Sequence, residues 1–346
     1  MRNRLPVLTI IGWSVVAAAG CTEKSSSVSS SPKSPTKELV LYAGRSKALV
    51  EGVIKMFEAE SGIDVRVKDG SSGDLAVLLA DEGADSPADV FWAQDAGSLS
   101  LVAGGNLFDV LPQDLLDKVS PSYRSRKGEW IATSGRARVL AYSPARVARD
   151  ELPSSVFDLT DPKWKGRVGW APQNASFQAF VTAMRKAAGE EKTRTWLRGM
   201  MALHKDKRYP KNTPILRALA DAEIDVGLPN HYYLLRFKKD DGDFPVAQTF
   251  FRAGDIGNLL NVAGLGILKT SKNRDNAVAF VKFLLSLRAQ EYFVNETFEY
   301  PVVGDIKGRG DLVDLNELLE AAPKVDLADL TDHQATMDLL REVNAL

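Results

Sequence analysis

The chain has 346 residues, with 44 Lys and Arg against 45 Asp and Glu, and a formal net charge of -1. This balance excludes an extended nucleic-acid surface, which needs an excess of basic residues. The length allows two lobes of ordinary domain size, each with its own core.

The first 37 residues predict an export signal followed by a linker. Two arginines precede the apolar stretch 5–16, and small residues occupy 17–20, so we expect residues 1–20 to be a signal peptide. The apolar stretch is short for a membrane span. Residues 21–37 are rich in serine and predict a flexible tether.

Cys21 is the single cysteine of the chain, so it has no disulfide partner within the chain. It follows Ala18-Ala19-Gly20, which resembles a bacterial lipobox with Ala18 where leucine is more common. We therefore expect lipidation at Cys21, with cleavage by the ordinary signal peptidase as the alternative. Several acyl chains would anchor the protein on the outer face of the cytoplasmic membrane, in the periplasm.

Strand and helix patterns alternate from residue 38 onward. Residues 38–44 and 63–68 predict strands on either side of a helix that is capped by Ser46 and ended by Gly62. This unit begins a parallel sheet, to which 87–92 adds a third strand.

Polar residues follow the carboxyl ends of these strands. Ligands of open α/β sheets collect there, so Arg45, Ser46, Gln94 and Asp95 are expected to share one rim. The glycine- and serine-rich turn 70–74 has amides that can bind an anion, although most such turns are only connections.

A longer strand is predicted over 132–142. Its Arg136 and Arg138 indicate either a segment that crosses between lobes or a strand with arginines on an exposed edge. Further on, Asn174 and Ser176 precede an apolar helix, where they are either helix caps or anion ligands.

The later elements continue the same alternation. Asn212 is expected as the N-cap of a helix with proline in its first turn. A return strand over 258–268, an apolar helix over 277–287 and two short helices after residue 312 follow.

Two adjacent tyrosines, Tyr232 and Tyr233, stand at a predicted strand-to-helix turn after the strand 223–227. Phenolate is a hard anionic ligand, and a trivalent cation such as Fe³⁺ is able to displace a phenol proton whose usual pKa is about 10. The alternative is one packed and one rim aromatic without a metal.

Catalytic chemistry has no comparable support. The chain contains three histidines but no His-Glu-x-x-His, Gly-x-Ser-x-Gly or P-loop pattern. We therefore expect a protein that is not an enzyme.

Seven short motifs, in order, resemble the ferric-iron-binding periplasmic proteins of bacterial ABC importers. They cover most of the chain between residues 38 and 303. They are Leu41-Tyr42-Ala43-Gly44-Arg45-Ser46, Pro87-Ala88-Asp89-Val90-Phe91, Ser134-Gly135-Arg136-Ala137-Arg138-Val139, Pro162-Lys163-Trp164-Lys165-Gly166, Tyr209-Pro210-Lys211-Asn212, Asn230-His231-Tyr232-Tyr233 and Glu299-Tyr300-Pro301.

The resemblance implies an α/β fold of the periplasmic binding protein type II class, with two lobes joined by crossing hinge strands. Lobe 1 would comprise residues 38–138 and 263–313, and lobe 2 residues 139–262 and 314–346. It also implies capture of ferric iron by a monomer, with delivery to a permease and its ATPase, and no binding of nucleic acid.

The site implied by the resemblance joins metal ligands to groups that hold a synergistic carbonate or phosphate. The metal ligands are Tyr232 and Tyr233. The groups expected to bind the anion or cargo are Arg45, Ser46, Gln94, Asn174, Ser176, Asn212 and Asn230.

Three positions depart from the family pattern. Ser46, Gln94 and Phe177 stand where relatives often have histidine, glutamate and tyrosine ligands. An oxyanion or small organic anion is therefore the alternative cargo, and the departures also leave another metal chelate open.

Overall fold

The computed structural model describes residues 37–304, 306–308, 312–330 and 332–346. The expected signal peptide, the lipidation site Cys21 and all but the last residue of the tether lie outside the described residues. Within the described ranges, none of the helices combines the length and the apolar character needed to cross a bilayer.

A five-stranded mixed sheet occupies one half of the described chain, in the order β2-β1-β3-β9-β4. The strands β2, β1 and β3 are parallel, and β9 is antiparallel to both of its neighbours. The bounds are β1 (Glu38–Ala43), β2 (Asp64–Asp69), β3 (Val90–Ala93), β4 (Ile131–Ala137) and β9 (Leu260–Ile267). Both β3 and β4 are buried along their whole length.

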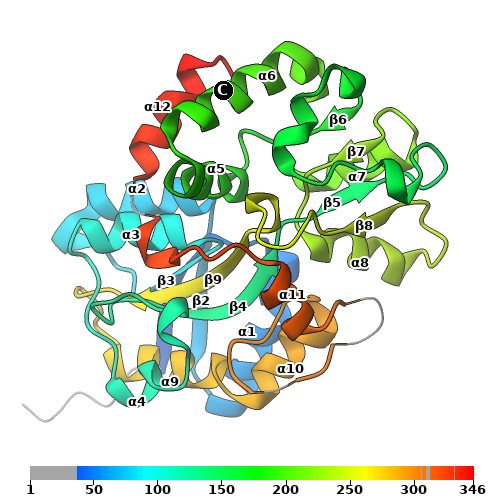
Figure 1. The fold of residues 1–346 in the computed structure, drawn as a ribbon. Coiled ribbons are helices and arrows are strands. Elements are labelled where there is room, and N and C mark those ends of the chain that lie inside the picture. The colour runs from blue at the N-terminus through cyan, green and yellow to red at the C-terminus, as the bar shows by residue number, and fades with distance from the viewer. Residues whose placement is uncertain (1–36, 305, 309–311, 331) are drawn as a thin grey trace, which may run out of the picture. The chain divides into compact units, whose positions relative to one another are not determined.

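Helices cover both faces of this sheet (Figure 1). One face carries α1 (Lys47–Ser61), α9 (Arg274–Leu284) and α10 (Leu287–Glu296), and the other carries α2 (Ser72–Glu82) and α3 (Ala96–Gly104). On the first face, aromatic rings interlock. The Phe280 ring lies 5.0 Å from Phe57 and 5.9 Å from Trp92, centroid to centroid. The short helix α4 (Gln113–Leu116) lies in the following connection.

A four-stranded sheet, in the order β6-β7-β5-β8, organises the other half. Its strands are β5 (Leu140–Tyr142), β6 (Val168–Gly169), β7 (Val226–Gly227) and β8 (Ala247–Thr249). The helices between these strands are α5 (Ala175–Ala188), α6 (Glu190–His204), α7 (Asn212–Ala220) and α8 (His231–Asp240).

The last helices are α11 (Leu315–Ala321) and α12 (His333–Glu342). Helix α12, red in Figure 1, packs against α5. The buried hydroxyls of Thr182 and Thr336 are 2.8 Å apart at this contact, and Arg185 pairs with Asp332 at 3.0 Å. The segment that includes α12 thus completes a core begun about midway along the chain.

The chain passes between the two sheets at two neighbouring places. The strand expected over 132–142 is interrupted, because β4 ends in the first sheet at Ala137 and β5 begins in the second at Leu140. The return lies between β8 and β9, and the Arg138 amide donates to the Leu259 carbonyl at 3.0 Å across the two passages. The α/β architecture with crossing strands is confirmed.

Two boundaries differ from expectation. Asn212 is the first residue of α7 and Lys211 is its N-cap, so the expected cap is one residue late. The expected helix over 277–287 is two helices. Ser286 separates them, because its hydroxyl accepts from the Ala289 amide and starts α10.

Candidate functional site

Tyr232 and Tyr233 lie in the first turn of α8, directly after the short strand β7 and its following turn. Their ring centroids are 4.4 Å apart, with an angle of 30° between the ring planes. Tyr232 is completely buried and Tyr233 is partly exposed. Gln94, just after β3, donates from Nε2 to the Tyr232 hydroxyl at 3.1 Å. This hydrogen bond joins a residue that follows the five-stranded sheet to one that follows the four-stranded sheet.

Both tyrosines line a cleft of about 510 Å³ between residues that follow the strands of the two sheets. The cleft brings together eight of the nine predicted metal, anion or cargo residues. They are Arg45, Ser46, Gln94, Asn174, Ser176, Asn230, Tyr232 and Tyr233. Gly70, Ser71 and Ser72 of the glycine- and serine-rich turn also line it.

Asn212 and Asp95 do not line this cleft. Asn212 is buried beside Lys211, and its Nδ2 has no hydrogen-bond partner among the described residues. Asp95 is the N-cap of α3 and accepts from the Ser98 amide at 2.8 Å. A capping role accounts for Asp95.

The predicted anion residues near α5 form a connected network. Asn174 caps α5 by accepting from the Ser176 amide at 3.1 Å. The Ser176 hydroxyl donates to Asn174 Oδ1 at 2.6 Å and accepts from Asn230 Nδ2 at 3.3 Å. The capping role expected for Asn174 is therefore present, and it places the positive end of the α5 dipole at the cleft.

Arg138 holds this network against the tyrosine turn. Its guanidinium donates to the carbonyl oxygens of Leu228 at 2.5 Å and Ser176 at 2.9 Å. Arg136 and Arg138 are 1% and 2% exposed, so the exposed-edge interpretation of these arginines is wrong. Burial, reinforced by the charge of Arg136, lowers the pKa of Arg138 to about 9.

Arg45 is committed to a partner that the sequence did not reveal. Its Nη2 donates to both carboxylate oxygens of Glu299, at 2.6 Å and 2.5 Å, and neither side chain is exposed. The guanidinium also lies 5.0 Å from the Trp92 ring centroid. Its Nε and Nη1 have no hydrogen-bond partner among the described residues. In the sequence, Glu299 was marked only as part of the motif Glu299-Tyr300-Pro301, and nothing there indicated its partner.

Burial sets the proton affinities at the tyrosine turn. Burial, and then the neighbouring Tyr233, raise the pKa of Tyr232 well above 10. Burial also lowers the pKa of His231 to about 4. His231 Nδ1 accepts from the Ala137 amide at 3.1 Å, and Nε2 donates to the Phe298 carbonyl at 2.6 Å. Both ring nitrogens of a neutral His231 are thus occupied.

The polar groups that line the cleft are suited to a hard cation together with an anion. In the described ranges, no group of three or more His, Cys, Asp or Glu side chains is placed to hold a metal. The anionic oxygen ligands that line the cleft are the two phenols and the carboxylate of Asp69. The phenols require a cation of high charge to release their protons. The amides and hydroxyls around them are suited to an anion.

Phe177, at the position where relatives often have a tyrosine ligand, belongs to the apolar core. Phe177 is 1% exposed and packs against Trp170 and Phe180, with ring centroids 5.6 Å and 5.5 Å away. The Arg138 guanidinium lies 5.3 Å from the Phe177 ring centroid. This ring offers no oxygen ligand.

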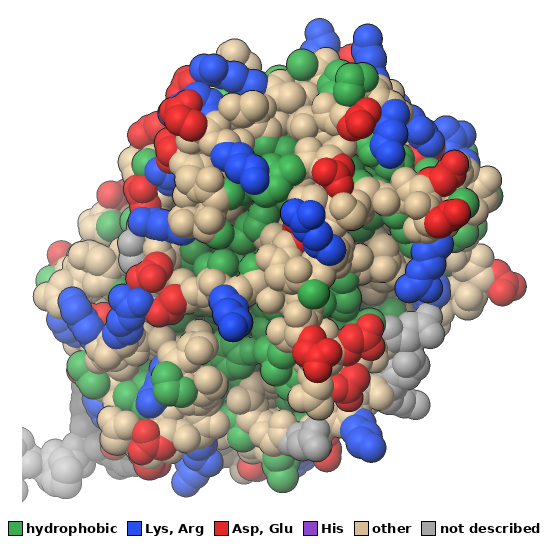
Figure 2. Space-filling view, in the orientation of Figure 1, with side chains coloured by type: hydrophobic (Ala, Val, Ile, Leu, Met, Phe, Trp, Pro, Cys, Tyr) green, Lys and Arg blue, Asp and Glu red, His purple; other side chains and the backbone are tan. Residues whose placement is uncertain are grey.

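Basic residues at the mouth of the cleft were not singled out from the sequence. Lys47 and Lys211 line the cleft itself, and Lys211 continues into an adjoining pocket with Arg217 and Arg236. Elsewhere, Figure 2 shows acidic and basic side chains interspersed over one face of the molecule. Asp69 lines the cleft and Asp240 lines the adjoining pocket, so these four basic side chains outnumber two carboxylates and the mouth has a net positive charge.

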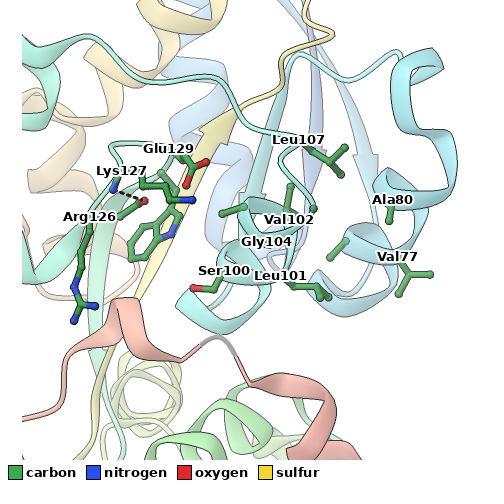
Figure 3. Close-up of a pocket in the computed structure, with 15 residues that line it drawn as sticks. Val77, Ala80, Ser100, Leu101, Val102, Gly104, Leu107, Arg126, Lys127 and Glu129 are labelled. Atoms are coloured by element: carbon green, nitrogen blue, oxygen red, sulfur yellow. Dashed lines mark hydrogen bonds between the residues drawn. The ribbon is translucent and has the colours of Figure 1, made fainter.

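A second, largely apolar cavity of about 530 Å³ lies apart from the predicted residues (Figure 3). Its wall includes Val77 of α2, Leu101 of α3 and Lys127, whose amide donates to the Ser125 hydroxyl at 3.2 Å. Val77 and Leu101 are 55% and 39% exposed. None of the predicted site residues lines this cavity.

Comparison with known proteins gives consistent matches along the chain. A family model described as bacterial extracellular solute-binding protein matches residues 85–324. The Fe(3+)-binding periplasmic protein of Serratia marcescens is 33% identical over 311 residues, which are 89% of this chain and 90% of the relative. The major ferric iron-binding protein of Neisseria meningitidis is 31% identical, covering 88% and 92% of the two chains.

A solved structure, iron-bound HitA from Pseudomonas aeruginosa, superposes with a TM-score of 0.85 at 34% identity. The match covers 88% of this chain and 99% of that one. This likeness confirms the expected two-lobed fold of the periplasmic binding protein type II class.

Proposed function

Since this chain belongs to the bacterial extracellular solute-binding protein family, together with the ferric-iron-binding periplasmic proteins, we propose that it captures ferric iron and delivers it to an ABC permease. Members of this family are binding proteins, so the chain is not an enzyme, as expected. The observation that carries the proposal is that Tyr232 and Tyr233 share one cleft with polar side chains that can donate hydrogen bonds to an anion.

In the proposed site, the two phenolates bind the metal and a small anion completes its shell. The anion, carbonate or phosphate, lies at the start of α5, near Asn174, Ser176 and Asn230. Partial positive charge from the helix start favours it there. Gln94 approaches the same oxygen of Tyr232 from the other sheet.

Binding is proposed to act through closure of the cleft. A ligand shifts a conformational equilibrium only by its difference in affinity for the two states. Tyr232 lies on one side of the cleft, and Gln94, Arg45 and Ser46 lie on the other. Cargo held from both sides therefore stabilises the closed state over an open one.

The position of the protein in the cell is part of the proposal. Lipidation at Cys21, after removal of residues 1–20, would tether the protein to the membrane beside its permease and ATPase. The protein acts as a monomer in the periplasm and binds no nucleic acid. Labelling with radioactive fatty acid, with Cys21→Ser as the control, tests the anchor.

Visible spectroscopy tests the ferric site directly. Protein titrated with ferric citrate in phosphate buffer is expected to develop a phenolate-to-iron charge-transfer band. Tyr232→Phe combined with Tyr233→Phe abolishes the band, whereas Tyr209→Phe, outside the cleft, retains it. A wild-type protein that stays colourless at saturating iron contradicts the proposal.

A second candidate is an oxyanion or small organic anion without metal. The observation that favours it is the supply of cationic and amide donors in the cleft, including Lys47 and Lys211. It predicts a higher Tm with phosphate or a sugar phosphate alone, and no further change on adding iron. Differential scanning fluorimetry with and without iron separates the two candidates.

A further inference from the structure

Arg136 is a buried cation whose guanidinium has no hydrogen-bond partner within the described part of the chain. It lies in β4 and is 1% exposed. Its Nε, Nη1 and Nη2 all lack a hydrogen-bond partner among the described residues. Arg45 and Arg138, the other two buried arginines at the site, each donate at least one hydrogen bond.

The backbone places Arg136 behind the tyrosine pair. Arg138 forms an isolated bridge with Asn230, and the Ala137 amide donates to the His231 ring. The end of β4 therefore lies against the start of α8, and Arg136 is the residue before Ala137 in β4. Its positive charge opposes the raised pKa of Tyr232.

Other unpaired donors surround Arg136. Asn261 is opposite Arg136 in the β4–β9 register, so their side chains share one face of the sheet. Its Nδ2 is buried and has no partner among the described residues, and the same holds for the hydroxyl of Ser134, two residues before Arg136. This cluster offers donors and little acceptor capacity, as an anionic occupant of the neighbouring cleft requires.

The carboxylate that acts electrostatically on Tyr232 already has hydrogen-bond partners of its own. Glu299 is held by Arg45 and by the Thr297 hydroxyl. Arg138 adds a second positive charge beside Arg136 and so increases the repulsion. A buried charge without a counter-charge destabilises the protein that contains it. The side chains around Arg136 therefore carry a surplus of positive charge that a bound anion would offset.

We propose that Arg136 is a specificity-determining residue, whose unpaired charge in β4 is neutralised by a cargo complex of net negative charge. A ferric ion with two phenolates and a divalent oxyanion is such a complex, so this inference rests on the proposed function. The cleft then favours iron accompanied by a multiply charged oxyanion over the bare ion.

Two substitutions separate charge from size. Arg136→Met removes the charge and keeps most of the length, and Arg136→Lys keeps the charge. We expect Arg136→Met to weaken ferric binding in phosphate buffer by about tenfold or more, and Arg136→Lys to remain within about threefold of wild type. Affinity is measured by competition with a chelator, and exposed Arg149→Met is the matched control.

The Tm of the iron-free protein separates a role in binding from a structural role of Arg136. Because the Met variant loses an uncompensated buried charge, its Tm without cargo is expected to equal or exceed that of wild type. A lower Tm with unchanged iron affinity overturns the inference, and so does equal loss of affinity in the Met and Lys variants. Arg136→Gln replaces the Met variant if that variant does not fold.

A phosphate arm distinguishes this inference from the proposed function. If wild type binds no iron but phosphate raises its Tm more than that of Arg136→Met, ferric capture fails and the charge role stands. If wild type binds iron and all three proteins bind it equally, the charge role fails and ferric capture stands.

Discussion

Arg45 and Glu299 form a completely buried ion pair between residues 254 positions apart in the chain. Arg45 follows β1, and Glu299 lies just after α10. The pair therefore joins the segment after α10 to the carboxyl end of β1, at the rim of the cleft. Thr297 supplies a further hydrogen bond to Glu299 at 3.1 Å.

Glu299→Gln is expected to lower the free energy of unfolding by about 3–5 kcal/mol, because it leaves the Arg45 charge buried without a counter-ion. Urea unfolding followed by circular dichroism measures the change. Glu296→Gln breaks an ion pair with Lys239 in which both side chains are 48% exposed, and is expected to cost less than about 1 kcal/mol. Equal effects of the two changes would show that burial of the pair is unimportant.

Gln94→Glu is expected to tighten ferric binding. Gln94 Nε2 lies 3.1 Å from the Tyr232 hydroxyl, so a carboxylate at this position would stand beside the proposed metal and add negative charge to its shell. We expect an affinity gain of about tenfold, which corresponds to about 1.4 kcal/mol. Chelator competition measures it, and Gln334→Glu on the exposed surface of α12 is the control. An unchanged or weaker affinity would remove position 94 from the metal shell.

Gly227→Ala is expected to destabilise the protein by about 1–3 kcal/mol through overpacking. Gly227 ends β7 before the tyrosine turn, and an added Cβ would lie 2.4 Å from Ile215 Cγ2. Gly73→Ala, where an added Cβ meets nothing within 4 Å, is the control and should not destabilise. Thermal unfolding of the two variants at one pH makes the comparison. Similar losses would exclude the Ile215 contact as the cause.

Acidification is expected to destabilise the protein in part through His204. Burial lowers the pKa of His204 below its ordinary 6.5, and the ring Nε2 lies 2.9 Å from the Leu159 carbonyl. The unfolded chain therefore binds the proton more tightly, and stability falls as pH drops through 6.5.

His204→Gln should reduce, but not abolish, the slope of unfolding free energy against pH just below 6.5, since His231 also has a lowered pKa. Urea titration at a series of pH values measures the slope. His333→Gln is the control, and the wild-type slope should remain. A slope in His204→Gln equal to that of wild type would assign the acid sensitivity to His231 and other groups.

The rim of the cleft could be predicted because it follows from sheet topology. Arg45, Ser46 and Gln94 follow the carboxyl ends of β1 and β3, two parallel neighbours whose ends meet at one edge of the sheet. Asp95, expected on the same rim, does not line the cleft. The tyrosine pair was recognisable from its position at a strand-to-helix turn. The general rule of sheet topology was enough for the rim residues, whereas the metal role of the tyrosines and the anion role of Asn230 were implied by the family resemblance.

Burial of the arginines could not be predicted in the same way. An apolar strand with Arg136 and Arg138 has the same pattern at an exposed edge as in a passage between two sheets. Nothing in 132–142 marks the change of sheet, since no proline interrupts it and its one glycine, Gly135, lies within β4. The pairing of Arg45 with Glu299 depends on a distant segment, which local periodicity does not encode.

The packing of α12 on α5 has a consequence for how the molecule forms. Thr182 and Thr336 meet although more than 150 positions separate them, while β9 and α9, made in between, belong to the other sheet. Contacts of such long sequence separation slow folding, because a large loop must close first. The nascent polypeptide therefore remains incompletely folded until the region around residue 340 has been synthesised. A contiguous fragment that includes the whole half with the tyrosines must also carry β9, α9 and α10.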